Sequence, residues 1–261
     1  MMTEKEVSYY SREIINPPGK ECLLVDFDGS MEALERSDLT PGSKRLALGL
    51  LFHGGVVEFP GGIGLDYSKI FKYGYDPYFT EAAIREIAEQ FDGKVNGIIC
   101  PDYSAIAPAV QLAVGMGIPL VRIRKDGNNH NNSFVVEVDS YTSEKRDTLG
   151  IDPKLFDLFD EGEVDLLFMD EIIDTGKMAR AVKGLIEQGR EAGLQVNLSG
   201  VAALMEKTYT GAAENIMQET GLNPYGVLKI EDLGFNPCQW VKIKGIDKGL
   251  VFNNNRWIDE K

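Results

Sequence analysis

The sequence predicts an α/β fold, a Rossmann-like parallel sheet flanked by helices on both faces. Two observations predict it. Between residues 95 and 230, apolar runs alternate with helical patterns, and the apolar runs are continuous instead of alternating with polar residues. Strands buried on both faces of a parallel sheet have such continuous runs. Ligands of these sheets bind at the carboxyl ends of the strands.

Each element is predicted from its own run of residues. Strands are predicted at residues 95–100, 118–123, 164–169, 195–204 and 224–230, and helices at residues 107–115, 179–188 and 212–219. Residues 128–132, Asn-Asn-His-Asn-Asn, are polar and predict a loop. The chain is therefore divided into an N-terminal extension (1–56), a core (57–234) and a tail (235–261). The tail carries Trp240, Phe252 and Trp257 and is expected to pack on the core; a dimer contact or a cover over the ligand pocket are the alternatives.

Composition limits the function classes. The chain has 261 residues, with 27 Lys and Arg against 41 Asp and Glu, so its formal net charge is −14. This surplus disfavours a general binder of nucleic acid or of anionic membranes. No run reaches the ~18 apolar residues of a membrane span, and no signal core is visible at the N-terminus, so a cytoplasmic protein is expected.

The three cysteines, Cys22, Cys100 and Cys238, are far apart and predict no disulfide framework or zinc site. Cys100 lies in an apolar run and is expected to be buried.

Residues 166–177, Leu-Leu-Phe-Met-Asp-Glu-Ile-Ile-Asp-Thr-Gly-Lys, carry the strongest signal for chemistry. Four apolar residues predict a buried strand, the acid pair Asp170 and Glu171 follows, and a short turn at Asp174 leads into a helix. Such a turn aims several backbone N–H groups at one point and can cradle a phosphate. The acid pair can accept hydrogen bonds from sugar hydroxyls or hold Mg²⁺. An acidic strand end followed by an ordinary helix cap is the alternative, and the Walker pattern is absent.

This segment resembles the phosphoribosyl-pyrophosphate (PRPP) motif of the type I phosphoribosyltransferases, and the resemblance extends over residues 57–233. Within that family the chain is similar to the purine branch, the xanthine and adenine enzymes. Further segments resemble that branch in the same order along the chain: a small hood (Phe59–Ile63 and Asp76-Pro77), the pyrophosphate loop (Ser104–Val110), an Arg124-Lys125 pair, a mobile loop (Ser140–Lys145 with Thr148) and a base-site segment (Glu206–Tyr209 with Gly211).

The resemblance implies the fold of that family and a reaction in which a nitrogenous base displaces pyrophosphate from Mg-PRPP, giving a nucleoside 5′-monophosphate. A 6-oxopurine such as xanthine is the expected base, Mg²⁺ is the expected cofactor, and a homodimer is expected. Positive charge develops on the ribose and negative charge on the leaving pyrophosphate, so cations facing the pyrophosphate would stabilise the transition state. Closure of loop 128–147 would exclude water.

The resemblance also implies a role for each candidate residue. Asp170 and Glu171 bind the ribose hydroxyls and the metal, and Glu144 and Lys145 complete the catalytic set. The 5′-phosphate is held by Asp174, Thr175, Gly176, Lys177 and Met178. The pyrophosphate is held by Asp102, Tyr103, Ser104, Ala105, Arg124, Lys125 and Arg146. The base contacts Lys207 and Ile63. These roles require one basic pocket on an acidic body, formed by Arg124, Lys125, Lys145, Arg146, Lys177 and Lys207.

Three departures from the family pattern bear on activity. Met178 stands where the family usually has a small hydroxyl residue, Glu171 stands where Asp is usual, and residues 67–75 differ from the base-site stretch of the xanthine branch. A non-catalytic PRPP- or nucleotide-binding regulator on the same fold, or an orotate-type enzyme, are therefore the alternatives. A DNA-binding regulator is not expected, because residues 1–56 contain no basic helix.

A second motif, Asp26-Phe27-Asp28-Gly29-Ser30, resembles the first motif of haloacid-dehalogenase-type phosphatases, in which the first Asp is a nucleophile. Such enzymes need a whole α/β domain, and only about thirty residues separate Ser30 from the predicted core. A strand that runs into an Asp-Gly turn is the simpler interpretation.

Overall fold

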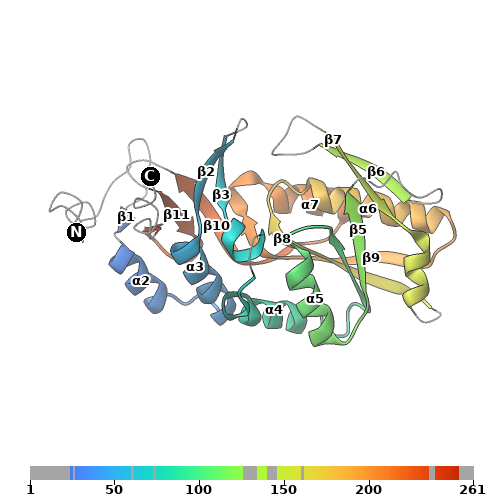
Figure 1. Ribbon diagram of the computed structural model, residues 1–261, viewed down its shortest axis with the longest axis horizontal. Coiled ribbons are helices and arrows are strands. Elements are labelled where there is room, and N and C mark those ends of the chain that lie inside the picture. Colours follow the sequence, from blue (N-terminus) through green and yellow to red (C-terminus); the bar gives the residue numbers. More distant parts are fainter. Residues whose placement is uncertain are drawn as a thin grey trace.

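The computed structural model describes residues 24–25, 27–59, 62–72, 75–125, 134–139, 146–159, 162–234 and 239–252. Within these residues, ten strands form one sheet in the order β1-β12-β11-β10-β9-β8-β4-β5-β7-β6 (Figure 1). The strands of this sheet are β1 (Leu24–Val25), β4 (Gly97–Pro101), β5 (Leu120–Lys125), β6 (Phe134–Asp139), β7 (Arg146–Ile151), β8 (Val164–Ile173), β9 (Val196–Lys207), β10 (Tyr225–Gly234), β11 (Trp240–Ile243) and β12 (Gly249–Val251).

A separate two-stranded hairpin, here called the hood hairpin, consists of β2 (Gly55–Phe59) and β3 (Gly62–Asp66). The helices are α2 (Phe27–Arg36), α3 (Pro41–His53), α4 (Pro77–Phe91), α5 (Ile106–Met116), α6 (Lys177–Glu191) and α7 (Ala212–Thr220), with short helical turns η2 (Ser68–Lys72), η4 (Pro153–Leu158) and η5 (Thr208–Thr210). All eight elements predicted between residues 95 and 230 are present.

The predicted parallel arrangement is confirmed for the centre of the sheet, where β5, β4, β8, β9 and β10 pair in parallel. The sheet as a whole is mixed, because β7 and β6 pair antiparallel at one side and β11 and β12 at the other. One core cluster packs α3, α4 and α5 on one face of the sheet, and a second packs α6 and α7 on the opposite face (Figure 1). The carboxyl ends of the central strands are therefore brought to one edge between two helical layers.

Polar caps fix where the helices of the first layer begin. The Asp76 side chain accepts the Tyr78 N–H at 2.9 Å, and Pro77 occupies the first turn of α4. Thr40 does the same for α3, accepting the Ser43 N–H at 3.2 Å before Pro41. These capped starts place α4 directly after the segment that carries Tyr67.

The turn predicted at Asp28-Gly29 is wrong, because both residues lie in the first turn of α2. Ser30 is fully buried and its Oγ accepts the Val251 N–H at 2.8 Å. Leu34, four residues later on the same face, is also buried. Burial of one helical face against β12 thus outweighs the local turn preference of Asp-Gly. Asp26 lies outside the described residues, so the phosphatase-like motif is not tested.

The loop predicted over residues 128–147 is also wrong in part. Residues 134–139 form β6, and β7 begins at Arg146 and includes Thr148. The two strands pair antiparallel from Phe134↔Ile151 to Asp139↔Arg146. β-Branched residues in the run Phe-Val-Val-Glu-Val favour a strand. Residues 126–133 and 140–145 lie outside the described residues.

The tail packs on the core where it is described, as predicted. Trp240 and Phe252 are buried, and residues 240–243 and 249–251 extend the sheet. Trp257 lies outside the described residues. The division of the chain at residues 56 and 234 stays a prediction. In the structure, strands from both sides of these boundaries belong to one sheet.

Cys100 is buried as predicted, whereas Cys22 and Cys238 lie outside the described residues. Among the helices of the described ranges, none has the length and apolar character needed to cross a membrane.

Candidate active site

A cavity of about 680 Å³ opens at the carboxyl edge of the central strands. The end of β8 and the start of α6 form one wall of it, and the segment between β4 and α5 forms another. The hood hairpin and the residues after it contribute Val57, Leu65 and Tyr67. The cavity thus joins the acid pair, the turn at Asp174 and the segment around Ser104, which are distant in the sequence.

Glu171 of the acid pair accepts hydrogen bonds that link β8 to the segment before α5 and to the segment after the hood hairpin. Ser104 Oγ donates a hydrogen bond to Glu171 Oε1 at 2.6 Å, and the Tyr67 hydroxyl donates to the same oxygen at 3.3 Å. Burial, followed by the charge of Glu171, raises the pKa of Asp170 well above its ordinary value. Burial, followed by the charge of Glu171, also raises the pKa of the Tyr67 phenol, which keeps this group a hydrogen-bond donor.

The turn from Asp174 to Gly176 is supported from behind by the segment that follows β9. Lys207 Nζ lies 2.7 Å from Asp174 Oδ2 in a buried ion pair, and Thr210 Oγ1 donates to the Asp174 carbonyl oxygen. Gly176 has φ 81°, and a Cβ there would lie 2.9 Å from Ile216 Cγ1 of α7. Asp174 Oδ1 is buried and, within the described residues, has no hydrogen-bond partner. The turn is therefore fixed on one side, and one buried acceptor has no partner among the described residues.

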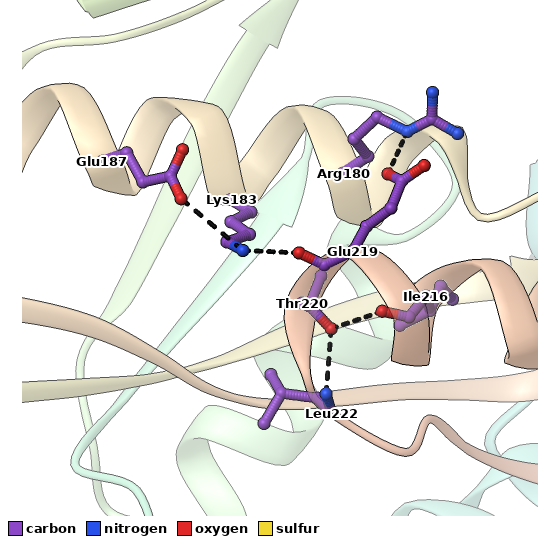
Figure 2. Close-up of polar contacts among 7 residues, drawn as sticks. All are labelled: Arg180, Lys183, Glu187, Ile216, Glu219, Thr220 and Leu222. Carbon is purple, nitrogen blue, oxygen red and sulfur yellow. Dashed lines mark hydrogen bonds and ion pairs between the residues drawn. The ribbon is translucent and has the colours of Figure 1, made fainter.

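The position of α7 is itself fixed by α6, as Figure 2 shows. Arg180 of α6 forms an ion pair with Glu219, and Lys183 donates a hydrogen bond to the Glu219 carbonyl oxygen. A cation at this end of α7 is favourable, because the last carbonyl groups of a helix lack intrahelical partners. Thr220 Oγ1 donates to the Ile216 carbonyl oxygen at 2.7 Å, which closes the last turn of α7. These contacts hold Ile216 against the turn from Asp174 to Gly176.

The segment between β4 and α5 contains a strained residue. Tyr103 has φ 133°, which is unusual for a residue with a side chain. Lys125 Nζ lies 4.7 Å from the centre of the Tyr103 ring and 3.1 Å from Asp147 Oδ2. The Asp102 N–H donates to the Ile123 carbonyl oxygen at 2.8 Å. The loop and the end of β5 are thereby held together at the cavity.

The structure brings together most of the residues that the sequence singled out. The cavity is lined by Asp102, Tyr103, Ser104, Lys125, Asp170, Glu171, Asp174, Thr175, Gly176, Lys177 and Met178. Ala105 is buried at the start of α5, and Lys207 is paired with Asp174. Arg124 and Arg146 are exposed and do not line this cavity; Arg146 lies 3.1 Å from Glu137 on the neighbouring strand. Glu144 and Lys145, and the side chain of Ile63, lie outside the described residues.

The predicted basic pocket stays a prediction, because Lys145 lies outside the described residues, but the described lining of the cavity is acidic. Two lysines, Lys125 and Lys177, face six carboxylates, a formal sum of 2 − 6 = −4. The carboxylates belong to Asp66, Asp102, Asp147, Asp170, Glu171 and Asp174. Lys125 is already paired with Asp147, and Lys207 with Asp174. Among the described residues, an anionic ligand would therefore meet more acidic than basic side chains.

Four residues of the site escaped the sequence reasoning: Tyr67, Asp147, Thr210 and Ile216. Tyr67 begins the stretch 67–75, which differs in sequence from the xanthine branch. This difference marked the stretch as unusual but did not predict a function for Tyr67. The other three act through contacts that only the fold creates, because their partners are distant in the chain.

The sequence was compared with family models and with curated proteins. No family model matches the chain. The chain is similar to xanthine phosphoribosyltransferase of Lactobacillus delbrueckii subsp. bulgaricus, with 30% identity over 158 residues, 59% of this chain and 78% of the relative. It is also similar to xanthine phosphoribosyltransferase of Stutzerimonas stutzeri, with 28% identity over 170 residues, 64% of this chain and 84% of the relative.

Solved structures with a similar fold include adenine phosphoribosyltransferases. The enzyme of Saccharomyces cerevisiae, complexed with an imino-altritol bisphosphate and adenine, gives a TM-score of 0.55 at 20% identity, covering 72% of this chain and 98% of that one. The enzyme of Giardia lamblia, complexed with 9-deazaadenine, gives a TM-score of 0.54 at 18% identity, covering 68% and 93%. These likenesses concern the fold.

Proposed function

Because the chain belongs to the type I phosphoribosyltransferase family, in its purine branch, we propose that it transfers the 5-phosphoribosyl group of PRPP to a 6-oxopurine, xanthine first, and releases pyrophosphate. One observation carries this proposal: a single cavity holds the acid pair of β8, the turn at Asp174 and the strained loop at Tyr103. We propose that the acid pair binds the ribose, the turn at Asp174 binds the 5′-phosphate and the loop at Tyr103 binds the pyrophosphate of PRPP.

The binding roles follow from the chemistry of each wall. Backbone N–H groups at the start of α6 hold the 5′-phosphate, because the N-terminus of a helix favours anions. Asp170 and Glu171 accept hydrogen bonds from the ribose hydroxyls, and the loop with Ser104 receives the pyrophosphate. The lining also includes the apolar residues Val57, Leu65 and Ile172, and this end of the cavity suits a planar base.

The base end offers an acceptor for a proton. As a base nitrogen attacks the anomeric carbon and pyrophosphate leaves, the nitrogen must lose its proton. Asp174 lines the cavity and Lys207 holds its Oδ2, so its carboxylate would accept this N–H group once the side chain turns the buried Oδ1 toward the ligand. A contact of Lys207 with an exocyclic oxygen of the base stays a prediction, because Lys207 is engaged with Asp174.

Mg²⁺ fits the carboxylate lining and is proposed as the cofactor. Within the part of the chain that the structure describes, no group of three His, Cys, Asp or Glu residues has the arrangement of a protein metal cage. Mg²⁺ commonly uses one or two carboxylates together with phosphate oxygens and water. Asp170 and Glu171 would hold it, and it would neutralise charge on the departing pyrophosphate. Cytoplasmic location and a homodimer also stay predictions.

A pyrophosphate-release assay tests the activity. The protein is incubated with PRPP, Mg²⁺ and, separately, xanthine, guanine, hypoxanthine, adenine or orotate. We expect turnover with xanthine or another 6-oxopurine. Turnover with orotate alone would favour the orotate-type alternative. No turnover with any base, together with thermal stabilisation by PRPP, would favour the non-catalytic regulator; no stabilisation by PRPP would contradict both.

Met178 gives a direct test of the phosphate-binding turn. It lies near the start of α6 and lines the cavity. Met178→Thr adds a hydroxyl donor, and a charge-assisted hydrogen bond is worth roughly 1.5–3 kcal/mol. We therefore expect PRPP or nucleotide to bind about tenfold more tightly, as measured by calorimetry. Met217→Thr, on the exposed face of α7, is the control. Equal affinities for all three proteins would mean that the backbone donors already suffice.

A further inference from the structure

A side chain of the tail forms a hydrogen bond with the hood hairpin, which contributes residues to the cavity. Gln239, immediately before β11, accepts the Val56 N–H on its Oε1 at 3.1 Å. Val56 belongs to β2 of the hood hairpin, where it pairs with Leu65 of β3. Leu65 and Val57, the residue after Val56, both line the cavity. A hydrogen bond therefore connects the tail to the strand that carries Val57.

The approach of Gln239 to the hairpin is close and specific. A Cβ at Gly55 would lie 2.9 Å from Gln239 Oε1, so a glycine at this position gives the amide room. The Phe252 N–H donates to the Gln239 carbonyl oxygen at 3.3 Å, which joins Gln239 to the end of β12. β12 is in turn fixed to α2, because Ser30 Oγ accepts the Val251 N–H. Gln239 is thus connected to β12 and, through β12, to α2 near the start of the described residues.

The pairing of β2 with β3 does not by itself fix the orientation of the hairpin. It is a two-stranded sheet of its own and does not join the main sheet. An isolated hairpin is only marginally stable, so its orientation depends on what it packs against. Val56 and Leu65 share a core cluster with Val241 and Phe252 of the tail. Apolar packing is weakly directional, whereas the bond from Gln239 fixes the position of one backbone group along β2.

We propose that the tail positions the hood hairpin through Gln239, and that Gln239 is a positioning residue for the base. This inference rests on the proposed function, because the end of the cavity that Val57 and Leu65 line is taken to hold the base. It assigns a role in the reaction to the tail: the strands β11 and β12 set how far the hood hairpin, which contributes Val57 and Leu65 to the cavity, stands from the ribose site. The PRPP ligands proposed above lie on β8, α6 and the segment between β4 and α5, so we expect PRPP binding to depend less on this contact than binding of the base does.

Two substitutions at one position separate the hydrogen bond from side-chain size. Gln239→Met keeps the length of the side chain and removes the amide acceptor, whereas Gln239→Glu keeps an acceptor oxygen. For Gln239→Met we expect the KM for the base to rise roughly threefold to tenfold, with kcat and the KM for PRPP within twofold of the wild type. Gln239→Glu should stay near the wild type. Gln90→Ala, at an exposed position of α4, serves as the control.

Hydrogen–deuterium exchange of residues 55–59 gives a readout that does not require turnover. In Gln239→Met the Val56 amide should exchange faster, and in Gln239→Glu it should not. Unchanged exchange in Gln239→Met, or equal rises of both KM values, would overturn the positioning role. Absence of turnover in the wild type would instead contradict the proposed function, while the exchange result would still decide whether the tail fixes the hairpin.

Discussion

Lys207→Met is expected to lower both stability and activity more than any other single change discussed. Lys207 is 6% exposed, and its Nζ lies 2.7 Å from Asp174 Oδ2. Removing one partner of a buried ion pair leaves the other charge uncompensated and costs roughly 3–5 kcal/mol. Because Asp174 keeps 23% of its side chain exposed, we expect about 3 kcal/mol, the low end of this range. Urea unfolding followed by fluorescence measures this loss.

The same substitution should reduce kcat/KM by at least about 100-fold, because the turn proposed to hold the 5′-phosphate loses the contact that orients Asp174. The double variant Lys207→Met with Asp174→Asn removes the stranded charge. It should regain most of the stability and none of the activity, as measured by unfolding and pyrophosphate release. A double variant as unstable as Lys207→Met alone would show that the Asp174 charge is not the cause.

A surface ion pair supplies the control for this prediction. Arg85 and Glu81 of α4 lie 2.9 Å apart and are both exposed. Pairs of this kind contribute little, because water and salt screen them. Arg85→Met should leave the midpoint of unfolding and the kinetics nearly unchanged.

Gly176→Ala is expected to weaken PRPP binding about tenfold or more. The glycine has φ 81°, a conformation that costs an L-residue roughly 1–2 kcal/mol. A Cβ would also lie 2.9 Å from Ile216 Cγ1 and 3.2 Å from the Ala212 carbonyl oxygen. Because α7 is clamped to α6 by Glu219, the turn must move instead of the helix. The backbone donors would then miss the phosphate, and calorimetry with PRPP measures the loss.

Gly221 is a matched control for the strain. It has φ 75°, yet a Cβ there would meet nothing within 4 Å. Gly221→Ala should therefore cost stability without weakening PRPP binding. Adding Ile216→Ala to Gly176→Ala removes the obstructing atom and should restore part of the affinity. If Gly221→Ala weakens PRPP binding as much as Gly176→Ala, the contact with Ile216 is not responsible.

The centre of the fold could be predicted because its signals are local. The strand at residues 164–169 is a continuous apolar run, and the turn after it carries acid, threonine and glycine in order. β11 and β12 give no such signal, because strands of four and three residues are too short for a period to show. Asp28-Gly29 misled because burial of Ser30 depends on β12, more than two hundred residues away.

The site could be predicted in its parts but not in its electrostatics. The sequence places Asp170, Glu171 and the turn at Asp174 on one segment, and the cavity confirms that they lie together. Counting cations could not show where they lie. Arg146 pairs with Glu137 across a hairpin, and Lys125 pairs with Asp147. Such pairings depend on strand register, which composition does not reveal.

The pairing of β1 with β12 has a consequence for how the protein is made. Leu24 lies beside Gly249, so 249 − 24 = 225 positions separate the two partners. Contacts of such long range are slow to form, because the chain loses entropy before the contact rewards it. At about 5–20 residues per second of synthesis, β1 waits more than roughly ten seconds on the ribosome for its partner. Gln239 also emerges long after residues 55–66, so the hood hairpin takes its final position only once Gln239 has been synthesised.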